Sequence, residues 1–195
     1  MTGEDSIYKA SVWICGKLRE NQVIPANREK EYIYGFELLI SSVVGIFCLL
    51  FLSLLSGIKY AWLPYLVGFI PLRVTGGGYH AKTHFKCIFS FSAVFVALLY
   101  LGKMLMAIRN AHLILVTISL ITMLFFAPLE AKNKPLPNQL RQKNRSRCIL
   151  ISCCAIAFSI ALILMKVNIN EYIMMYSMGV FAAGLSILAV VLERK

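Results

Sequence analysis

The chain has 195 residues, of which 59% are hydrophobic and 15% charged, and its net charge at pH 7 is +11. A soluble domain of this length would hold about half apolar and about a quarter charged residues, so the composition excludes an ordinary soluble globule. The apolar residues stand in blocks long enough to enter a bilayer as helices. These blocks lack the ten-residue alternation of an outer-membrane barrel. We therefore predict an all-α integral membrane protein.

The first predicted element is an amphipathic helix over residues 6–20. Apolar side chains recur there at helical spacing (Ile7, Ala10, Ile14 and Leu18), with four charged residues among them. Such a pattern is typical of a helix that lies in the membrane interface. A terminal helix packed on the rest of the protein would show the same pattern, and the sequence does not separate the two.

Six apolar blocks follow, and we predict about six membrane helices from them. The blocks cover residues 32–55, 60–72, 88–101, 113–129, 149–165 and 172–192. The second block is short and contains Pro64 and Pro71, so we expect it to be tilted, broken or partly inserted. Glu37, near the start of the first block, is expected at the level of the lipid headgroups, with a pairing inside the helix bundle as the alternative.

The basic residues predict the orientation of the chain. Placing the N-terminus, residues 73–87, residues 131–147 and the C-terminus in the cytoplasm puts 16 of the 20 Lys and Arg inside. This is the positive-inside distribution, and it accounts for the net charge without a nucleic-acid partner. We predict one membrane domain over residues 1–195, with both termini, a loop at 73–87 and a basic loop at 131–147 in the cytoplasm.

Residues 73–87 hold the candidate chemistry. Three glycines (Gly76, Gly77 and Gly78) precede His80, and Cys87 follows the histidine by seven residues. On one straight helix His80 and Cys87 would lie about 10 Å apart along the axis, too far for a direct contact. A catalytic pair therefore requires a break near residues 79–83, with Cys87 near the start of a new helix. From spacing alone, the two residues form either a cysteine–histidine dyad or a structural pair.

His84 offers two further alternatives. With His80 and Cys87 it forms H-x-x-x-H-x-x-C, which would suit zinc if the segment were helical, or His84 could be the base in place of His80. Ala81 stands where a zincin has its Glu, so we expect no metal and no other cofactor. Four of the other cysteines lie in or beside apolar blocks, where they are expected to be small hydrophobic residues (Cys48, Cys148, Cys153 and Cys154).

The pattern Arg73-x-x-x-Gly77-Gly78-x-His80 followed by Cys87 resembles the accessory gene regulator B (AgrB) family. A later run from Ala127 to Pro135, A-P-x-x-x-x-N-K-P, supports the resemblance, as do the chain length and the order of segments. The resemblance implies a membrane cysteine endopeptidase of the bacterial cell membrane, with Cys87 and His80 catalytic. It further implies that Arg73, Gly77 and Gly78 position the substrate or the loop.

The implied substrate is a small quorum-sensing precursor peptide of AgrD type. The enzyme would remove the C-terminal tail of this precursor and assist closure of a thiolactone. The implied partners are this peptide and the lipid bilayer, with a homodimer as one candidate assembly. The alternative from another class is a non-enzymatic exporter or membrane partner of a signalling peptide. Such an exporter would be expected to carry ionisable residues deep in its spans, and the apolar blocks contain almost none.

Overall fold

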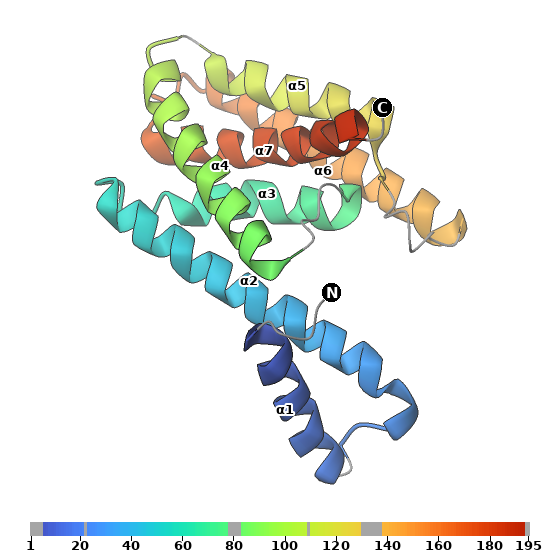
Figure 1. Ribbon diagram of the computed structural model, residues 1–195. Coiled ribbons are helices and arrows are strands. Elements are labelled where there is room, and N and C mark those ends of the chain that lie inside the picture. The colour runs from blue at the N-terminus through green and yellow to red at the C-terminus, as the bar shows by residue number, and fades with distance from the viewer. Residues whose placement is uncertain (1–5, 22, 78–82, 109, 130–137, 194–195) are drawn as a thin grey trace. The chain divides into compact units, whose positions relative to one another are not determined.

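The computed structural model describes residues 6–21, 23–77, 83–108, 110–129 and 138–193. Within these ranges the chain is helical, and one isolated bridge between Gly77 and Leu129 is the sole β-type pairing. The α-helices are α1 (Ser6–Glu20), α2 (Glu29–Leu55), α3 (Trp62–Gly76), α4 (His84–Leu105), α5 (Ala111–Phe126), α6 (Asn138–Leu164) and α7 (Glu171–Glu193), with a 3₁₀ turn at Ala26–Arg28 (Figure 1). The prediction of an all-α membrane protein is thereby confirmed.

Four helices are long and apolar enough to cross a membrane: α2, α4, α6 and α7. The other two apolar helices are shorter, with 16 residues in α5 and 15 in α3. At 1.5 Å per residue, α3 is about 22 Å long, less than the ~30 Å of a hydrocarbon core. It is nevertheless continuous through Pro71, so the predicted second block is short without being broken.

Two predicted loops are smaller than expected. Residues 138–147 form the first turns of α6, and the predicted loop at 131–147 was wrong for that part. The Gln, Arg and Lys residues that follow the two prolines of this segment have high helix propensity. A polar composition predicts exposure to solvent, but it does not exclude a helix. Likewise, residues 73–76 end α3 and residues 84–87 begin α4, which leaves at most residues 77–83 for the predicted loop at 73–87.

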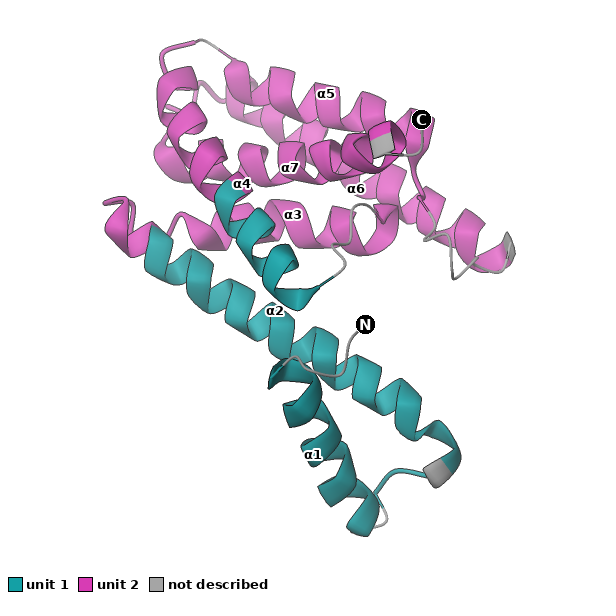
Figure 2. Cartoon of the chain, in the orientation of Figure 1, with its two compact units in different colours: residues 1–52, 80–93 teal, residues 53–79, 94–195 magenta. Residues whose placement is uncertain are grey.

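The chain divides into two compact units (Figure 2). The first comprises residues 1–52 and 80–93, and thus α1, most of α2 and the start of α4. In it, α1 buries Ser11 and Cys15, and Arg19 Nη1 reaches Glu29 Oε2 at 2.9 Å. Trp13 stays 68% exposed, together with Tyr8 and Val12. An exposed apolar face of this kind suits the predicted interfacial position of α1.

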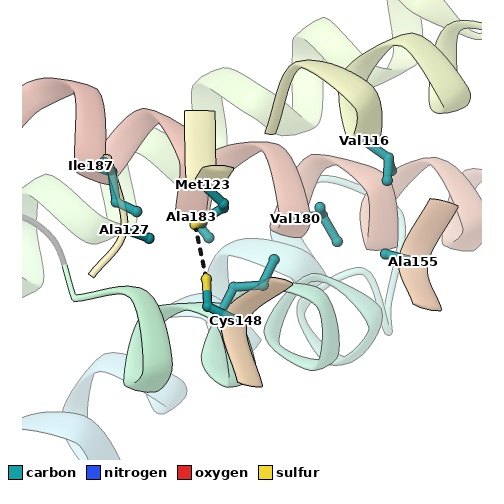
Figure 3. Packing of buried hydrophobic residues seen from close by; sticks show 9 residues of the cluster. Val116, Met123, Ala127, Cys148, Ala155, Val180, Ala183 and Ile187 are labelled. Carbon is teal, nitrogen blue, oxygen red and sulfur yellow. Dashed lines mark hydrogen bonds between the residues drawn. The ribbon is translucent and has the colours of Figure 1, made fainter. Parts of the chain in front are cut away.

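The second unit comprises residues 53–79 and 94–195, and α7 packs in it against both α3 and α5. Its core is a cluster of small and medium apolar residues from α3, α5, α6 and α7 (Figure 3): Leu72, Val116, Met123, Ala127, Cys148, Ala155, Val180, Ala183 and Ile187. At its centre Cys148 Sγ lies 3.3 Å from Met123 Sδ. Cys148 is thus a buried packing residue, as expected.

Backbone contact between α3 and α7 depends on two glycines. A Cβ added at Gly68 would overlap the carbonyl oxygen of Tyr176, and one at Gly179 would overlap the carbonyl oxygen of Tyr65. Membrane helices have no hydrophobic drive toward one another, so they associate through such close packing of small residues. Beside this contact, Ser119 of α5 donates a 2.7 Å hydrogen bond to the Val180 carbonyl of α7.

Alanine substitution at either glycine is therefore expected to destabilise the protein. Gly68→Ala and Gly179→Ala should each cost about 1–3 kcal/mol, because the added methyl group meets backbone that cannot rotate away. Gly35→Ala in α2 is the control, since nothing lies within 4 Å of its added Cβ, and it should be neutral or slightly stabilising. Thermal unfolding in detergent measures all three. Equal melting temperatures for the three variants would contradict the close helix contact.

Candidate active site

The glycine motif begins at the C-terminal end of α3, in the second unit. Gly77 caps the helix with φ 76° and ψ −152°, and its N–H donates to the Arg73 carbonyl at 3.1 Å. A Cβ on Gly77 would overlap the carbonyl oxygen of Leu129. Both the positive φ and this close approach require glycine, so the position is fixed by backbone geometry.

The same end of α3 contacts the second motif segment. The Leu129 N–H donates to the Gly76 carbonyl at 3.0 Å, and Leu129 forms the isolated bridge with Gly77. Residues 127–129 belong to the run that supported the family resemblance, and the fold places it directly on the glycines. This contact was not predicted, because nothing in the spacing of two segments some fifty residues apart reveals that they meet.

Backbone amides of a glycine run such as Gly76–Gly78 could form an oxyanion hole, or the run could be a hinge without catalytic contact. The Gly77 N–H donates its hydrogen bond to the Arg73 carbonyl oxygen, so it is not free to bind an oxyanion in this structure. Gly78 lies outside the described residues. The half-buried Arg73 belongs to the last turn of α3, where a cation also suits the negative end of the helix dipole. Gly77 itself is held by its positive φ and its contact with Leu129.

The candidate nucleophile lies at the start of α4, in the first unit. Thr83 precedes the helix, and its Oγ1 accepts the Lys86 N–H at 3.3 Å, as an N-cap residue does. The Thr83 carbonyl accepts the Cys87 N–H at 3.0 Å, which places Cys87 in the first turn. The expected break in the chain is thus present, since α3 ends at Gly76 and α4 begins at His84. The thiol of Cys87 is half-buried.

His80 lies outside the described residues, so its pairing with Cys87 stays a prediction. Among the described residues no group of three or more His, Cys, Asp or Glu is close enough to hold a metal ion. Of the residues predicted to form the site, the structure places Cys87 in the first unit and Arg73 and Gly77 in the second.

His84 is buried and has an acidic neighbour. Its side chain is 9% exposed, that of Glu37 is 7% exposed, and Nε2 lies 3.9 Å from Glu37 Oε1. Glu37 was expected at the headgroups, but the structure has the alternative, a pairing inside the protein. The sequence did carry a signal for it, because a carboxylate within an apolar block must find a partner or stay near water.

The basic residues ahead of the sixth block lie on the exposed first turns of α6. Arg141, Lys143, Arg145 and Arg147 are all exposed. At 100° per residue, Arg141 and Arg145 share one side of the helix, and Lys143 and Arg147 share another. A helical surface thus replaces the predicted loop, and it presents these four cations without an acidic residue among them.

Cys15 and Cys87, the two cysteines outside the pattern of the apolar blocks, differ in accessibility. Cys15 is fully buried, and burial together with the nearby Glu29 carboxylate raises the pKa of its thiol. A raised pKa leaves less thiolate at any pH below it, and thiolate is the reactive form. Cys15 is therefore an inert structural thiol, whereas Cys87 is partly accessible at a helix start.

Comparison with known proteins identifies one family. The sequence model of "Accessory gene regulator B" (AgrB) matches residues 11–190, nearly the whole chain. No curated protein and no solved structure was found to match.

Iodoacetamide is expected to distinguish the thiol of Cys87 from that of Cys15. On a background in which the other four cysteines are alanine, Cys87 should be alkylated about tenfold faster than Cys15 at pH 8, and Glu29→Gln should narrow the gap by lowering the pKa of Cys15. Mass spectrometry of the detergent-solubilised protein gives both rates. Faster labelling of Cys15 than of Cys87 would contradict the assignment of Cys15 as inert.

Proposed function

We propose that this chain, which belongs to the AgrB family, is a cysteine endopeptidase that processes a quorum-sensing precursor peptide of AgrD type. Membership of the family agrees with a role in peptide processing at the membrane. The observation that carries the finer proposal is the position of Cys87. It is a partly accessible thiol in the first turn of α4, seven residues after His80 of the glycine motif.

The proposed reaction needs a nucleophile and one base. Cys87 Sγ attacks the carbonyl carbon of the scissile peptide bond while His80 takes the thiol proton. The C–N bond then breaks, His80 returns the proton to the leaving amine, and the precursor's N-terminal part remains as a thioester on Cys87. A cysteine thiol within the precursor attacks this thioester, which forms the thiolactone and restores Cys87.

The start of α4 supports this chemistry in two ways. The positive end of a helix dipole favours negative charge in the first turn, where Cys87 lies. A site at the membrane surface is also partly protected from water, and hydrolysis would waste the thioester. Cyclisation is an intramolecular attack, so it competes well once water is scarce.

The proposed orientation places Cys87 at the cytoplasmic surface. Glu37 and His84 are neighbours, and a Cβ on Gly45 would lie 3.9 Å from Phe91. The later residue of α2 meets the later residue of α4, so the two helices run in the same direction. Two spans of equal direction, with α3 between them in sequence, agree with the charge-based arrangement. The precursor would then reach Cys87 from the cytoplasm.

The exposed cations of α6 are proposed to attract the acidic tail of the precursor. Each exposed pair contributes about 0–1 kcal/mol, so the four cations matter as a group. A precursor confined to the interface by an amphipathic helix of its own would meet them at a raised effective concentration. This role is one of binding and not of chemistry.

Substitutions at the proposed dyad test the reaction. Cys87→Ser, Cys87→Ala and His80→Ala should abolish precursor cleavage with unchanged amounts of protein in the membrane, because the thiolate and its base are both required. His84→Ala should leave cleavage detectable. Cleavage of an AgrD-type precursor in proteoliposomes is the measurement. An active Cys87→Ser variant would remove Cys87 as the nucleophile, and no cleavage by the unsubstituted protein would favour the exporter alternative. A dead His84 variant beside an active His80 variant would reassign the base.

Neutralising the cations of α6 tests the proposed binding. Changing Arg141, Lys143, Arg145 and Arg147 together to Gln should raise KM about tenfold with kcat nearly unchanged, and the difference should shrink at high salt because exposed charges are screened.

These cations also help to set the orientation, so the quadruple variant needs a topology control. A single cysteine placed at its C-terminus should react with an impermeant thiol reagent only after the cells are permeabilised. An unchanged KM in a correctly oriented variant would leave these residues a topological role alone.

A further inference from the structure

The Glu37–His84 pair is not used by the proposed reaction. Both residues are buried, and among the described residues Glu37 is the sole buried carboxylate. Taking a carboxylate out of water costs several kcal/mol unless a partner compensates. A buried carboxylate in a membrane protein therefore suggests a functional role. The two side chains lie 3.9 Å apart, an ion-pair distance when His84 is protonated, and His84 Nε2 has no hydrogen-bond partner in the described structure.

Stability alone does not explain the pair. Replacing both members of a buried ion pair with well-packed hydrophobic side chains of similar volume is often neutral or even stabilising. Apolar side chains of that kind would therefore fill the same space between α2 and α4 with little or no loss of stability. What the Glu37–His84 contact adds is an attraction between two particular polar side chains, which holds them in one arrangement.

That arrangement lies beside the nucleophile. His84 and Cys87 are three residues apart on α4, so they are neighbours on one side of the helix with Cβ atoms about 5–6 Å apart. The Thr83 side chain caps this turn through one 3.3 Å hydrogen bond. About two turns further along, Gly45 of α2 approaches Phe91 of α4, so that a Cβ on Gly45 would lie 3.9 Å from the ring.

We propose that the Glu37–His84 pair is a positioning device that anchors the first turn of α4 to α2 and thereby holds Cys87 Sγ in its direction of attack. The inference rests on the proposed function, because it assigns a role in the reaction of Cys87. Neither residue acts on the substrate itself. A displacement of about 1 Å at a reacting group lowers a rate by up to about a hundredfold, which gives such an anchor its value.

Neutral replacements of similar size test the pair. Glu37→Gln, His84→Asn and the double variant are compared in the full-length protein, reconstituted in proteoliposomes. Two substitutions serve as matched controls. Glu31→Gln changes an exposed acid of α2 that pairs with Arg28, and His112→Asn changes a buried histidine of α5 in the second unit. The readouts are kcat and KM for precursor cleavage and the rate of Cys87 alkylation by iodoacetamide.

Loss of positioning should move the two rates in opposite directions. Each single variant should lower kcat about tenfold with KM within about twofold, while a loosened turn exposes Cys87 and speeds its alkylation about threefold. The double variant should lose no more of kcat than the less active of the two single variants, because the two residues act as one unit. Both controls should match the unsubstituted protein.

Three results would overturn the proposal: an unchanged kcat in both single variants, additive losses in the double variant, or alkylation that slows together with cleavage. The alkylation rate needs no substrate, so it separates this proposal from the proposed function. If Cys87→Ser still cleaves the precursor, the endopeptidase proposal fails whatever the alkylation rates show. If Cys87→Ser is dead and the pair variants are unaffected, the positioning role alone fails.

Discussion

Close backbone contact between α3 and α7 is the constraint on which the second unit depends. Gly68 and Gly179 let the two helices approach until their peptide groups touch, at a spacing no side chain would allow. Because lipid is as apolar as leucine, packing of this kind and not hydrophobic burial holds membrane helices together. With α7 also against α5, the contact gathers the small core residues around Cys148 and Met123.

That packing reaches the glycine motif through the end of α3. A Cβ on Gly76 would come within 3.2 Å of both Cys148 Sγ and Met123 Sδ, so the last turn of α3 is seated directly on the core. One residue later Gly77 turns the chain against Leu129. The glycines therefore start the connection toward α4 from a rigid point. At Gly76 and Gly77 the glycine motif is thus held by close contacts with its neighbours.

The first unit has a different organisation, in which charged residues make several of the contacts. Arg19 bonds to Glu29 between α1 and α2, and Glu37 faces His84 between α2 and α4. Polar contacts fix the orientation of side chains more than apolar ones do, so in the proposed enzyme they would suit a region that presents Cys87 in one orientation. In the proposed enzyme, the second unit would contribute closely packed membrane helices, and the first unit would orient the Cys87 nucleophile.

The sequence by itself determined the helical class, the long apolar spans and the extent of α1, because a bilayer admits few backbone solutions and the length of an apolar block predicts a span. It also located the break before Cys87, since seven residues of helix would have separated that residue from His80. Only the tertiary structure decided the partner of Glu37, the contact of Gly77 with Leu129 and the helical form of residues 138–147. The first two join residues some fifty positions apart, and the third depends on where a polar segment begins a helix. Periodicity records which side of a helix is apolar, but not which neighbour will cover it.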